Sequence, residues 1–474
     1  MQDADQRVRA LSANKQLLLA KAVGGGVLKP ARPGLVRRPD AEPPPLSPQQ
    51  RQLWMGDVPP SPLYEGPPPL NQSVCLLLEG DLDPTALRWA FRRLIERHET
   101  LRMDFPVVAG APTVRIASEL DCDVPIVDLS RGSLEGRQDE ALEIARNEEQ
   151  TGFSHQRGPL FRAKLFRLRR DRFVLFFLID HILFDGWSFG IFVRELGALY
   201  AAKTTSTSPE LPPLSLTYAD YAHSESLRLT PDLVDRTLNM WRDVLAGLDP
   251  QPDLVGDKRT APQPFRLAQT SLELGPELSS RAVTFSRSNA VSLFATLLTA
   301  YKLTFHRLCG ATDITAVTQV TNRLDSSVYG LIGKFANSVV TRSRVSPSRS
   351  FSEAVRSEFG GLMRSLAHQD FPYSTLHHRL FPHGDPTRLS FGLQNYPMPP
   401  LALAGITMHP IYTNFGASLR DLAVTLFQDI SGVHGEFSFN SALYSDELID
   451  SVKDAFSRLL SDGLDHPDRA LRQL

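Results

Sequence analysis

The sequence is poor in cysteine and carries almost no net charge. Its 474 residues include three cysteines, Cys75, Cys122 and Cys309, which lie far apart and form no CxxC pair. We therefore expect reduced thiols, with neither a disulfide framework nor a zinc site. The formal net charge is −2, and no dense run of Lys and Arg interrupts that balance. Nucleic acid is therefore excluded as the expected partner.

Long apolar segments are also missing. The longest apolar run lies around residues 173–179, far short of the roughly 20 residues that a membrane helix needs. The chain begins Met1-Gln-Asp-Ala-Asp, without the basic start and apolar middle of a signal peptide. It contains no glycine loop of the phosphate-binding Gly-x-x-x-x-Gly-Lys type and no carrier-type serine motif. The missing membrane segment and signal peptide predict a cytoplasmic protein with no membrane contact. The missing phosphate loop and carrier motif leave activation and tethering to other proteins or to other parts of a longer chain.

The composition is that of an ordinary globular protein, with 42% hydrophobic and 22% charged residues, and from Leu46 on the pattern is mixed α and β. The length exceeds that of one ordinary core, so we expect two packed lobes. Residues 1–45 have the pattern of a short helix followed by a proline-rich linker or docking tail. A second proline-rich patch, 208–213, divides the rest into an N-terminal lobe, 46–212, and a C-terminal lobe, 213–474.

Local patterns predict individual elements. Asp83 and Pro84 supply an N-cap and a first-turn proline for a helix. The continuous apolar run 173–179 is typical of a strand buried on both faces. By the same reasoning we expect strands near residues 73–78, 101–105, 315–320, 338–341 and 422–427, and helices near 291–308 and 445–460.

The segment most informative about chemistry directly follows the buried strand and reads Asp180-His-Ile-Leu-Phe-Asp-Gly-Trp-Ser188. Ionisable side chains at the end of a central strand, just before a helix, commonly lie in a cleft. Burying them beside so much apolar sequence costs several kcal/mol unless each finds a partner. A lone His after a strand is more often a core residue, so its interpretation depends on the segments around it.

Seven segments in order resemble motifs of the condensation-domain family of nonribosomal peptide synthetases. That family carries His-His-x-x-x-Asp-Gly where this chain has Asp180 to Gly186, and its wider acyltransferase superfamily keeps His-x-x-x-Asp-Gly. The other similar segments are Leu46-Ser-Pro-Gln-Gln-Arg-Gln-Leu-Trp54, Arg97-His-Glu-Thr-Leu-Arg102, Tyr218-Ala-Asp-Tyr-Ala222, Ile332-Gly-Lys-Phe-Ala-Asn337, His368-Gln-Asp-Phe-Pro372 and Phe439-Asn-Ser-Ala-Leu-Tyr444. The resemblance covers about residues 46–474.

The resemblance implies a fold and a set of roles. The fold is that of two chloramphenicol-acetyltransferase-like lobes in a V-shaped pseudo-dimer, with the active site in the cleft between them. His181 corresponds to the catalytic His near the reacting nucleophile. Asp185 corresponds to an Asp that braces the loop, with Gly186 at the turn and Arg323 as the expected partner of Asp185.

The family pattern is broken at Asp180, which replaces the first His of the motif. In the family that His serves mainly packing and hydrogen bonding, so catalysis need not be lost. A carboxylate close to His181 would favour the protonated imidazole, but adjacent strand residues point to opposite faces. Asp180, Trp187 and Ser188 are candidates for the substrate cleft, although the start of a helix is the simpler interpretation of Trp187 and Ser188.

The reaction implied is attack by an amine or hydroxyl on a thioester carbonyl, which forms an amide or an ester. His181 would take the proton of the nucleophile, or orient a neutral amine and stabilise the tetrahedral intermediate. Confinement of two tethered substrates would supply much of the rate. The family's substrates ride on phosphopantetheine arms, so we expect donor and acceptor carrier proteins as partners. We expect no metal or cofactor bound by the chain itself, and a monomer.

Three other functions fit parts of the sequence. A non-catalytic recruiting domain of the same fold would explain Asp180, but it has no chemical need for His181 and Arg323. Heterocyclization domains carry Asp-x-x-x-x-Asp-x-x-Ser, which matches here from Asp180 on, but they lack His181. A coenzyme-A-dependent acyltransferase of the plant type carries Asp-Phe-Gly-Trp-Gly, which residues 414–417 match only in part. A free-standing enzyme and an excised piece of a megasynthase fit the sequence equally.

Overall fold

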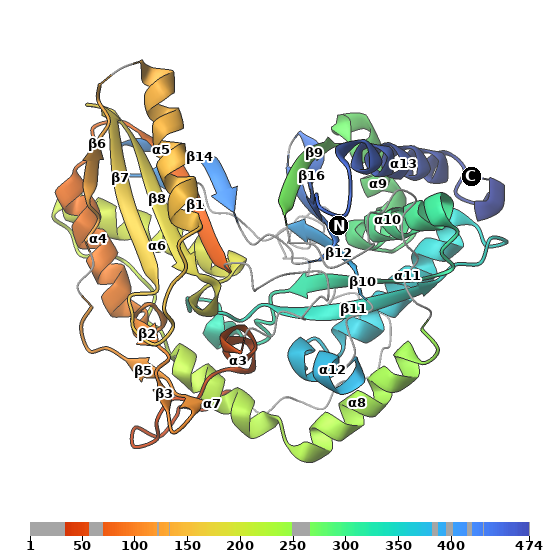
Figure 1. Cartoon of the computed structure of the whole chain (residues 1–474), viewed down its shortest axis with the longest axis horizontal. Helices are drawn as coiled ribbons and strands as arrows, with labels where there is room; N and C mark the ends of the chain where they lie inside the picture. Colours follow the sequence, from red (N-terminus) through yellow and green to blue (C-terminus); the bar gives the residue numbers. More distant parts are fainter. Residues whose placement is uncertain are drawn as a thin grey trace, which may run out of the picture.

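The chain forms two α/β lobes, each built around a six-stranded sheet, which diverge from a common base in the shape of a V (Figure 1). A computed structural model describes residues 34–55, 70–120, 123–131, 133–248, 266–381, 387–394, 402–414, 420–429 and 431–473. Among these residues no helix is long and apolar enough to cross a membrane. The predicted N-terminal helix and Cys122 lie outside the described residues. The expected fold class is confirmed.

The sheet of the N-terminal lobe has the strand order β13-β14-β1-β8-β7-β6. The bounds of its strands are β1 Asn71–Glu79, β6 Ile126–Asp128, β7 Phe161–Arg169, β8 Arg172–Asp180, β13 Ala402–Leu403 and β14 Ile406–Asn414. Helices α4 (Pro84–Arg97) and α6 (Gly186–Thr205) pack on one face of this sheet, and α5 (Leu134–Glu149) packs on the other. The short elements η1 Glu99–Arg102, β2 Met103–Asp104, β3 Val107–Val108, β4 Ala111–Pro112 and β5 Arg115–Ile116 lie beside it.

The predicted buried strand is the central strand β8, flanked by β1 and β7, both antiparallel to it. Phe177 faces α4 and α6 and stacks on Phe192, with ring centroids 4.5 Å apart. Phe176 on the other face contacts the α5 cluster. Because β8 is covered on both faces, its apolar run is continuous and does not alternate with polar residues.

The sequence correctly predicts the start of α4 but wrongly predicts a strand in the segment after it. The Asp83 side chain accepts hydrogen bonds from the amides of Thr85 and Ala86, which confirms the predicted N-cap. The predicted strand 101–105 is wrong over its first part, because residues 99–102 form the 3-10 helix η1. Its turn is closed by the Leu101 amide and the His98 carbonyl, 3.1 Å apart.

The hairpin β13–β14 comes from late in the chain and completes the N-terminal sheet. β14 pairs antiparallel with β1, from Ser73 opposite Asn414 to Glu79 opposite Thr407. The hairpin approaches the chain closely at Gly80, which has a φ of +141° and where a Cβ atom would lie 2.6 Å from the Gly405 carbonyl oxygen. The boundary between residues 212 and 213 stays a prediction. Along the chain this hairpin lies between β12 and β15 of the C-terminal sheet, although it pairs in the N-terminal sheet.

The sheet of the C-terminal lobe has the order β11-β10-β12-β15-β16-β9. Its strands are β9 Leu267–Glu273, β10 Asp313–Val320, β11 Asn337–Arg344, β12 Leu389–Gln394, β15 Leu422–Asp429 and β16 Gly432–Asn440. Helices α9 Gly275–Ser288, α10 Leu293–Cys309, α11 Phe351–Leu366 and α13 Asp446–Asp465 pack on one face. On the other face lie α8 Pro231–Leu245 and α12 Tyr373–Leu380.

The base of the V is formed by α3 (Pro48–Trp54), α7 (Tyr218–Arg228) and the connection between β10 and β11, which includes η3 (Ser326–Val328) (Figure 1). The short helix η4 (Leu471–Gln473) ends the described chain. The predicted helices near 291–308 and 445–460 correspond to α10 and α13, and the three strands predicted for this lobe correspond to β10, β11 and β15. These predictions are confirmed.

Candidate functional site

The candidate site lies where β8 leaves the N-terminal sheet and meets the base. His181 begins the 3-10 helix η2 (His181–Leu183), which leads into α6. Its backbone amide donates to the Leu70 carbonyl at 2.9 Å, and the next amide, of Ile182, donates to the Asp180 carboxylate at 2.9 Å. The backbone that carries His181 is therefore held on both sides.

Asp185 is the fully buried N-cap of α6 and connects the two lobes. Its Oδ1 accepts from the Ser188 amide at 2.9 Å and from the Arg323 guanidinium at 3.2 Å. Its Oδ2 accepts from the amides of Phe335 and Ala336 at 3.0 and 3.1 Å. Burial alone would raise the pKa of Asp185, but Arg323, Ser188 and Lys334 outweigh it and hold that pKa below its ordinary value.

Arg323 is only 3% exposed and is held through both terminal nitrogens of its guanidinium. Besides Asp185, it donates to the carbonyls of Val328 and Leu331, each at 2.7 Å, and its Cζ atom lies 3.9 Å from the centre of the Phe335 ring. The structure therefore brings Arg323 and Asp185 together as the resemblance implies. This pair braces the turn at Gly186 against the C-terminal lobe.

Trp187 and Ser188 also connect the lobes. The indole of Trp187 donates to the Tyr329 carbonyl at 3.1 Å. The hydroxyl of Ser188 lies 3.0 Å from both the amide and the carbonyl oxygen of Gly333, and the side chain is completely buried. In this conformation both side chains are therefore occupied in holding the loop.

Asp180 points away from His181 and bonds to a residue that the sequence did not single out. Its Oδ2 lies 2.8 Å from Nε2 of His155, in the loop before β7, and its Oδ1 caps η2. The His155 ring in turn stands edge-on to Phe105. His155 is an isolated residue in a polar loop, so no local signal marks it.

The direct side-chain partner of His181 is Lys334. The Lys334 Nζ atom lies 2.7 Å from Nε2 of His181, and Lys334 is 7% exposed. The His181 side chain is half-buried, with its Nδ1 atom fully buried and without a hydrogen-bond partner among the described residues. The sequence identified residues 332–337 as a motif segment but did not predict a role for Lys334 within it. The available signal was a single cation inside an otherwise apolar segment.

The environment shifts the pKa values of both members of this pair. Burial and the Lys334 ammonium lower the pKa of His181 well below its ordinary value, and Asp185 with the Phe184 backbone only partly opposes them. Burial also lowers the pKa of Lys334 to about 8, although Asp185 acts in the opposite direction. Near pH 7 the pair therefore consists of a neutral imidazole and an ammonium.

Three further motif segments gather around the site and hold its backbone. Thr100 donates through its hydroxyl to the Ile332 carbonyl at 2.8 Å, and Tyr218 to the Lys334 carbonyl at 2.6 Å. The Asn337 amide donates to the Phe371 carbonyl at 2.7 Å. Residues far apart in sequence thus fix the segment that presents Lys334.

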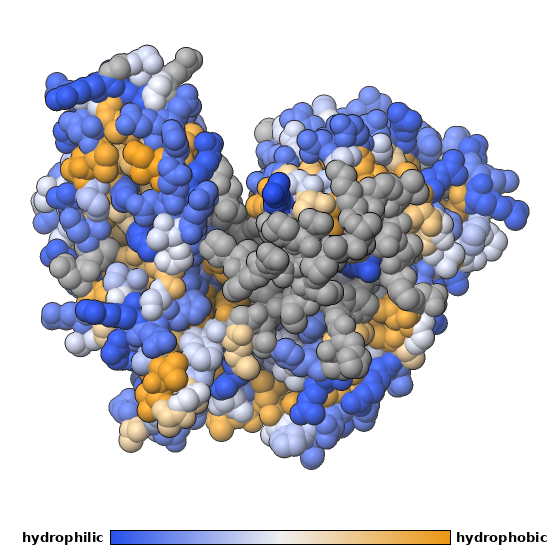
Figure 2. All heavy atoms as spheres, viewed as in Figure 1, coloured by the Kyte–Doolittle hydropathy of each residue, from blue (hydrophilic) through white to orange (hydrophobic). Residues whose placement is uncertain are grey.

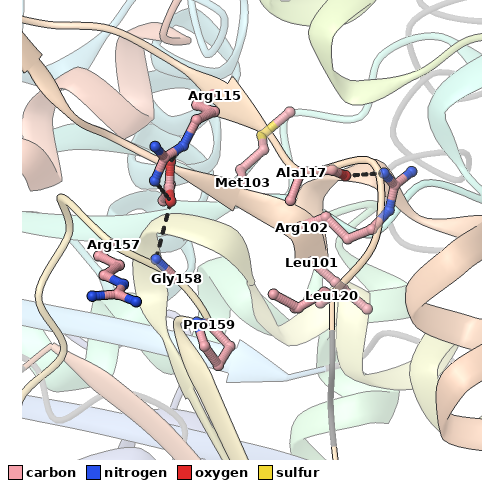
Figure 3. A pocket seen from close by; sticks show the side chains of 10 residues that line it. Leu101, Arg102, Met103, Arg115, Ala117, Leu120, Arg157, Gly158 and Pro159 are labelled. Atoms are coloured by element: carbon pink, nitrogen blue, oxygen red, sulfur yellow. Dashed lines mark hydrogen bonds and ion pairs between the residues drawn. The ribbon is translucent and has the colours of Figure 1, made fainter.

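A separate pocket of about 190 Å³ lies in the N-terminal lobe beside β2 and β5 (Figure 3). Asp104 is one of the lining residues, and its carboxylate accepts hydrogen bonds from Arg115 Nε at 2.9 Å and from the Gly158 amide at 3.1 Å. His181, Lys334 and Asp185 do not line it. The surface is also indented between the two lobes, above the base at which they join (Figure 2).

Comparison with known sequences identifies a family that matches nearly the whole chain. A family model described as the condensation domain matches residues 41–474. One of the linear gramicidin synthase proteins of Brevibacillus parabrevis is 32% identical over 426 residues, which are 88% of this chain and 8% of that protein. The phosphinothricin tripeptide synthetase PhsC of Streptomyces viridochromogenes is 31% identical over 474 residues, 97% of this chain and 43% of that protein. The chain thus spans less than half of either relative.

Solved structures share the fold over nearly all of their length. The X-domain from teicoplanin biosynthesis, in its complex with OxyB, has a TM-score of 0.79 at 24% identity and covers 95% of this chain and 99% of its own. The SgcC5 protein of Streptomyces globisporus has a TM-score of 0.75 at 26% identity and covers 90% and 100%. The first condensation domain of the calcium-dependent antibiotic synthetase has a TM-score of 0.75 at 20% identity and covers 91% and 99%.

Proposed function

Because this chain belongs to the condensation-domain family of nonribosomal peptide synthesis, we propose that it transfers a carrier-tethered acyl or peptidyl group to an amine or hydroxyl acceptor. The product is an amide or an ester. The observation that supports this most is His181, a half-buried imidazole at the junction of the lobes, held on both sides and neutral near pH 7. Asp185, Gly186 and Arg323 keep its loop in place.

The lowered pKa of His181 favours one of the two roles expected for it. A free α-ammonium has a pKa of about 8, so it would transfer its proton only unfavourably to an imidazole whose pKa lies well below 6.5. Once the amine nitrogen has bonded to the carbonyl carbon, it is far more acidic. His181 therefore orients the neutral amine and then takes its proton as the tetrahedral intermediate forms. Collapse of the intermediate breaks the C–S bond, and the phosphopantetheine thiolate takes up a proton.

The proposed function requires carrier domains as partners and two lobes between which the substrates meet. Condensation domains of nonribosomal peptide synthetases work on substrates carried on the phosphopantetheine of carrier domains, so donor and acceptor carriers are the proposed partners. Residues 46–212, with His181, and 213–474, with Arg323, are the proposed lobes that these substrates enter between in a monomeric domain, with the hairpin β13–β14 of the second segment pairing in the N-terminal sheet. The chain binds no cofactor of its own in this proposal.

A product assay tests this function. A donor carrier loaded with an acyl-phosphopantetheine is mixed with the chain and a panel of amine and alcohol acceptors, and products are identified by mass spectrometry. Product from the loaded carrier but not from the same acyl group on coenzyme A is the expected result. Transfer from coenzyme A alone would instead identify an acyltransferase, and a product lighter by one water than the condensation product would identify heterocyclization.

A non-catalytic recruiting role is the second candidate, and Asp180 in place of the first motif His is what favours it. The X-domain of similar fold is known in a complex with OxyB. A recruiting domain would bind loaded carriers, measured by calorimetry, but would yield no product with any acceptor.

A further inference from the structure

Lys334 is held at His181 by a rigid backbone. The amide of Gly333 donates to Ser188 at 3.0 Å, and the amide of Phe335 donates to Asp185 at 3.0 Å. Tyr218 donates to the carbonyl of Lys334 itself at 2.6 Å. Because the peptide groups on both sides are fixed by the neighbouring lobe, the side chain is directed at Nε2 of His181, 2.7 Å away.

The ammonium of Lys334 has an unusual environment for a structural lysine. Among the residues that the structure describes, no carboxylate forms an ion pair with it, although it is 7% exposed. Lys302, which is also enclosed, pairs with Glu358 at 2.9 Å. Burying an ammonium without a counter-ion is unfavourable by several kcal/mol in typical proteins. Stability of the fold therefore gives no reason for a lysine here, whereas the chemistry of His181 does.

We propose that Lys334 is a positioning residue for His181. Its ammonium donates an N–H to Nε2, which places the proton of the neutral imidazole on Nδ1 and fixes the ring until the acceptor takes this hydrogen bond over. The inference rests on the proposed function, because it assigns a role within that site. It adds a residue that lies at the variable position of the Gly-x-Phe segment.

The charged groups around the pair support this assignment. Asp185 lies at the start of α6 and Arg323 in the connection between β10 and β11, but the two are already paired with each other, and Tyr218 approaches from α7. Asp180 is turned away toward His155. The charge in contact with the imidazole is therefore that of Lys334, which is consistent with the lowered pKa of His181. Since the pKa of Lys334 is about 8, this charge is present at neutral pH.

The test is an NMR titration of the full chain with isotope-labelled histidine. The signal of His181 is assigned among the 12 histidines by its loss in His181→Ala. In Lys334→Met the pKa of His181 should rise by about one pH unit or more, because a like charge beside it is removed. In Lys334→Arg it should stay low. Lys453→Met, on α13 in the other lobe, is the matched control and should leave the pKa of His181 unchanged.

Wild-type protein supplies a second readout that does not depend on a variant folding. The Nε2 signal of His181 should shift as Lys334 loses its proton near pH 8. An unchanged pKa in folded Lys334→Met, or a wild-type Nε2 signal that is flat through pH 8, would overturn the inference. Neither readout needs turnover. An inactive wild type would therefore refute the proposed function while leaving the titration to decide the role of Lys334.

Discussion

At the scale of single residues, the site depends on one buried carboxylate. Asp185 accepts from two backbone amides of the C-terminal lobe and from Arg323, while it also caps α6. Removing the guanidinium would leave this carboxylate buried without its counter-ion. A buried charge that has lost its partner is among the most destabilising changes that a single substitution can make.

Arg323→Met should therefore lower the free energy of unfolding by about 3–5 kcal/mol at pH 7, measured by urea denaturation. Arg281→Met removes a surface pair with Asp465 and should cost less than about 1 kcal/mol. The pKa of Asp185 is lowered in the folded chain, so the contribution of the pair is present above the unfolded pKa near 4 and is lost as the pH falls through the lower folded pKa. A difference that does not shrink below pH 4 would contradict this assignment.

Sequence reasoning reached some of these residues and not others. His181 and Asp185 could be named because they stand in a segment that resembles a family motif, and Arg323 because the resemblance implies an arginine partner for Asp185. Lys334 and His155 could not, because their roles arise from contacts with His181 and Asp180 across 153 and 25 residues of sequence. A cation inside an apolar segment marks Lys334 itself, but no local pattern marks its contact with His181 or the contact of His155 with Asp180.

At the scale of elements, features with a local sequence signal could be predicted, and features formed by contacts between distant segments could not. The strand β8 and the start of α4 could be predicted, because a continuous apolar run and an Asp-Pro cap are local signals. The pairing of β14 with β1 could not, since it joins Ser73 to Asn414 across most of the chain. The first sheet is therefore completed by an edge that the sequence alone places in the other lobe.

The glycine at this edge is the most sensitive test of that pairing. Gly80→Ala would place a Cβ atom 2.6 Å from the Gly405 carbonyl and 2.9 Å from the Ile406 side chain, at a φ of +141°. We expect a loss of stability clearly above the roughly 1 kcal/mol that a positive φ alone costs an alanine. Gly110→Ala, with a φ of +81° and open space around it, is the control and should show only that smaller loss in urea denaturation. Equal losses in both variants would argue against the close approach of the hairpin.

At the scale of the whole molecule, the site exists only when the two lobes are joined. The N-terminal lobe supplies His181 and Asp185, while the connection between β10 and β11 supplies Arg323 and Lys334. Substrates that enter between the lobes would therefore meet groups from both. The length alone predicts two lobes, and the family resemblance implies their fold, whereas the contacts that build the site between them follow only from the tertiary structure.

The most direct test of the central claim is the single-turnover rate of product formation by the wild type, His181→Ala and Asp180→His, with one loaded donor carrier and one accepted nucleophile. The account predicts that His181→Ala loses at least about 100-fold in rate, as expected for a positioned acid–base group, while all three proteins bind the carrier equally. Asp180→His should not exceed the wild type, because Asp180 bonds to His155 and not to His181. Wild-type activity retained in His181→Ala, or activity gained only by Asp180→His, would contradict it.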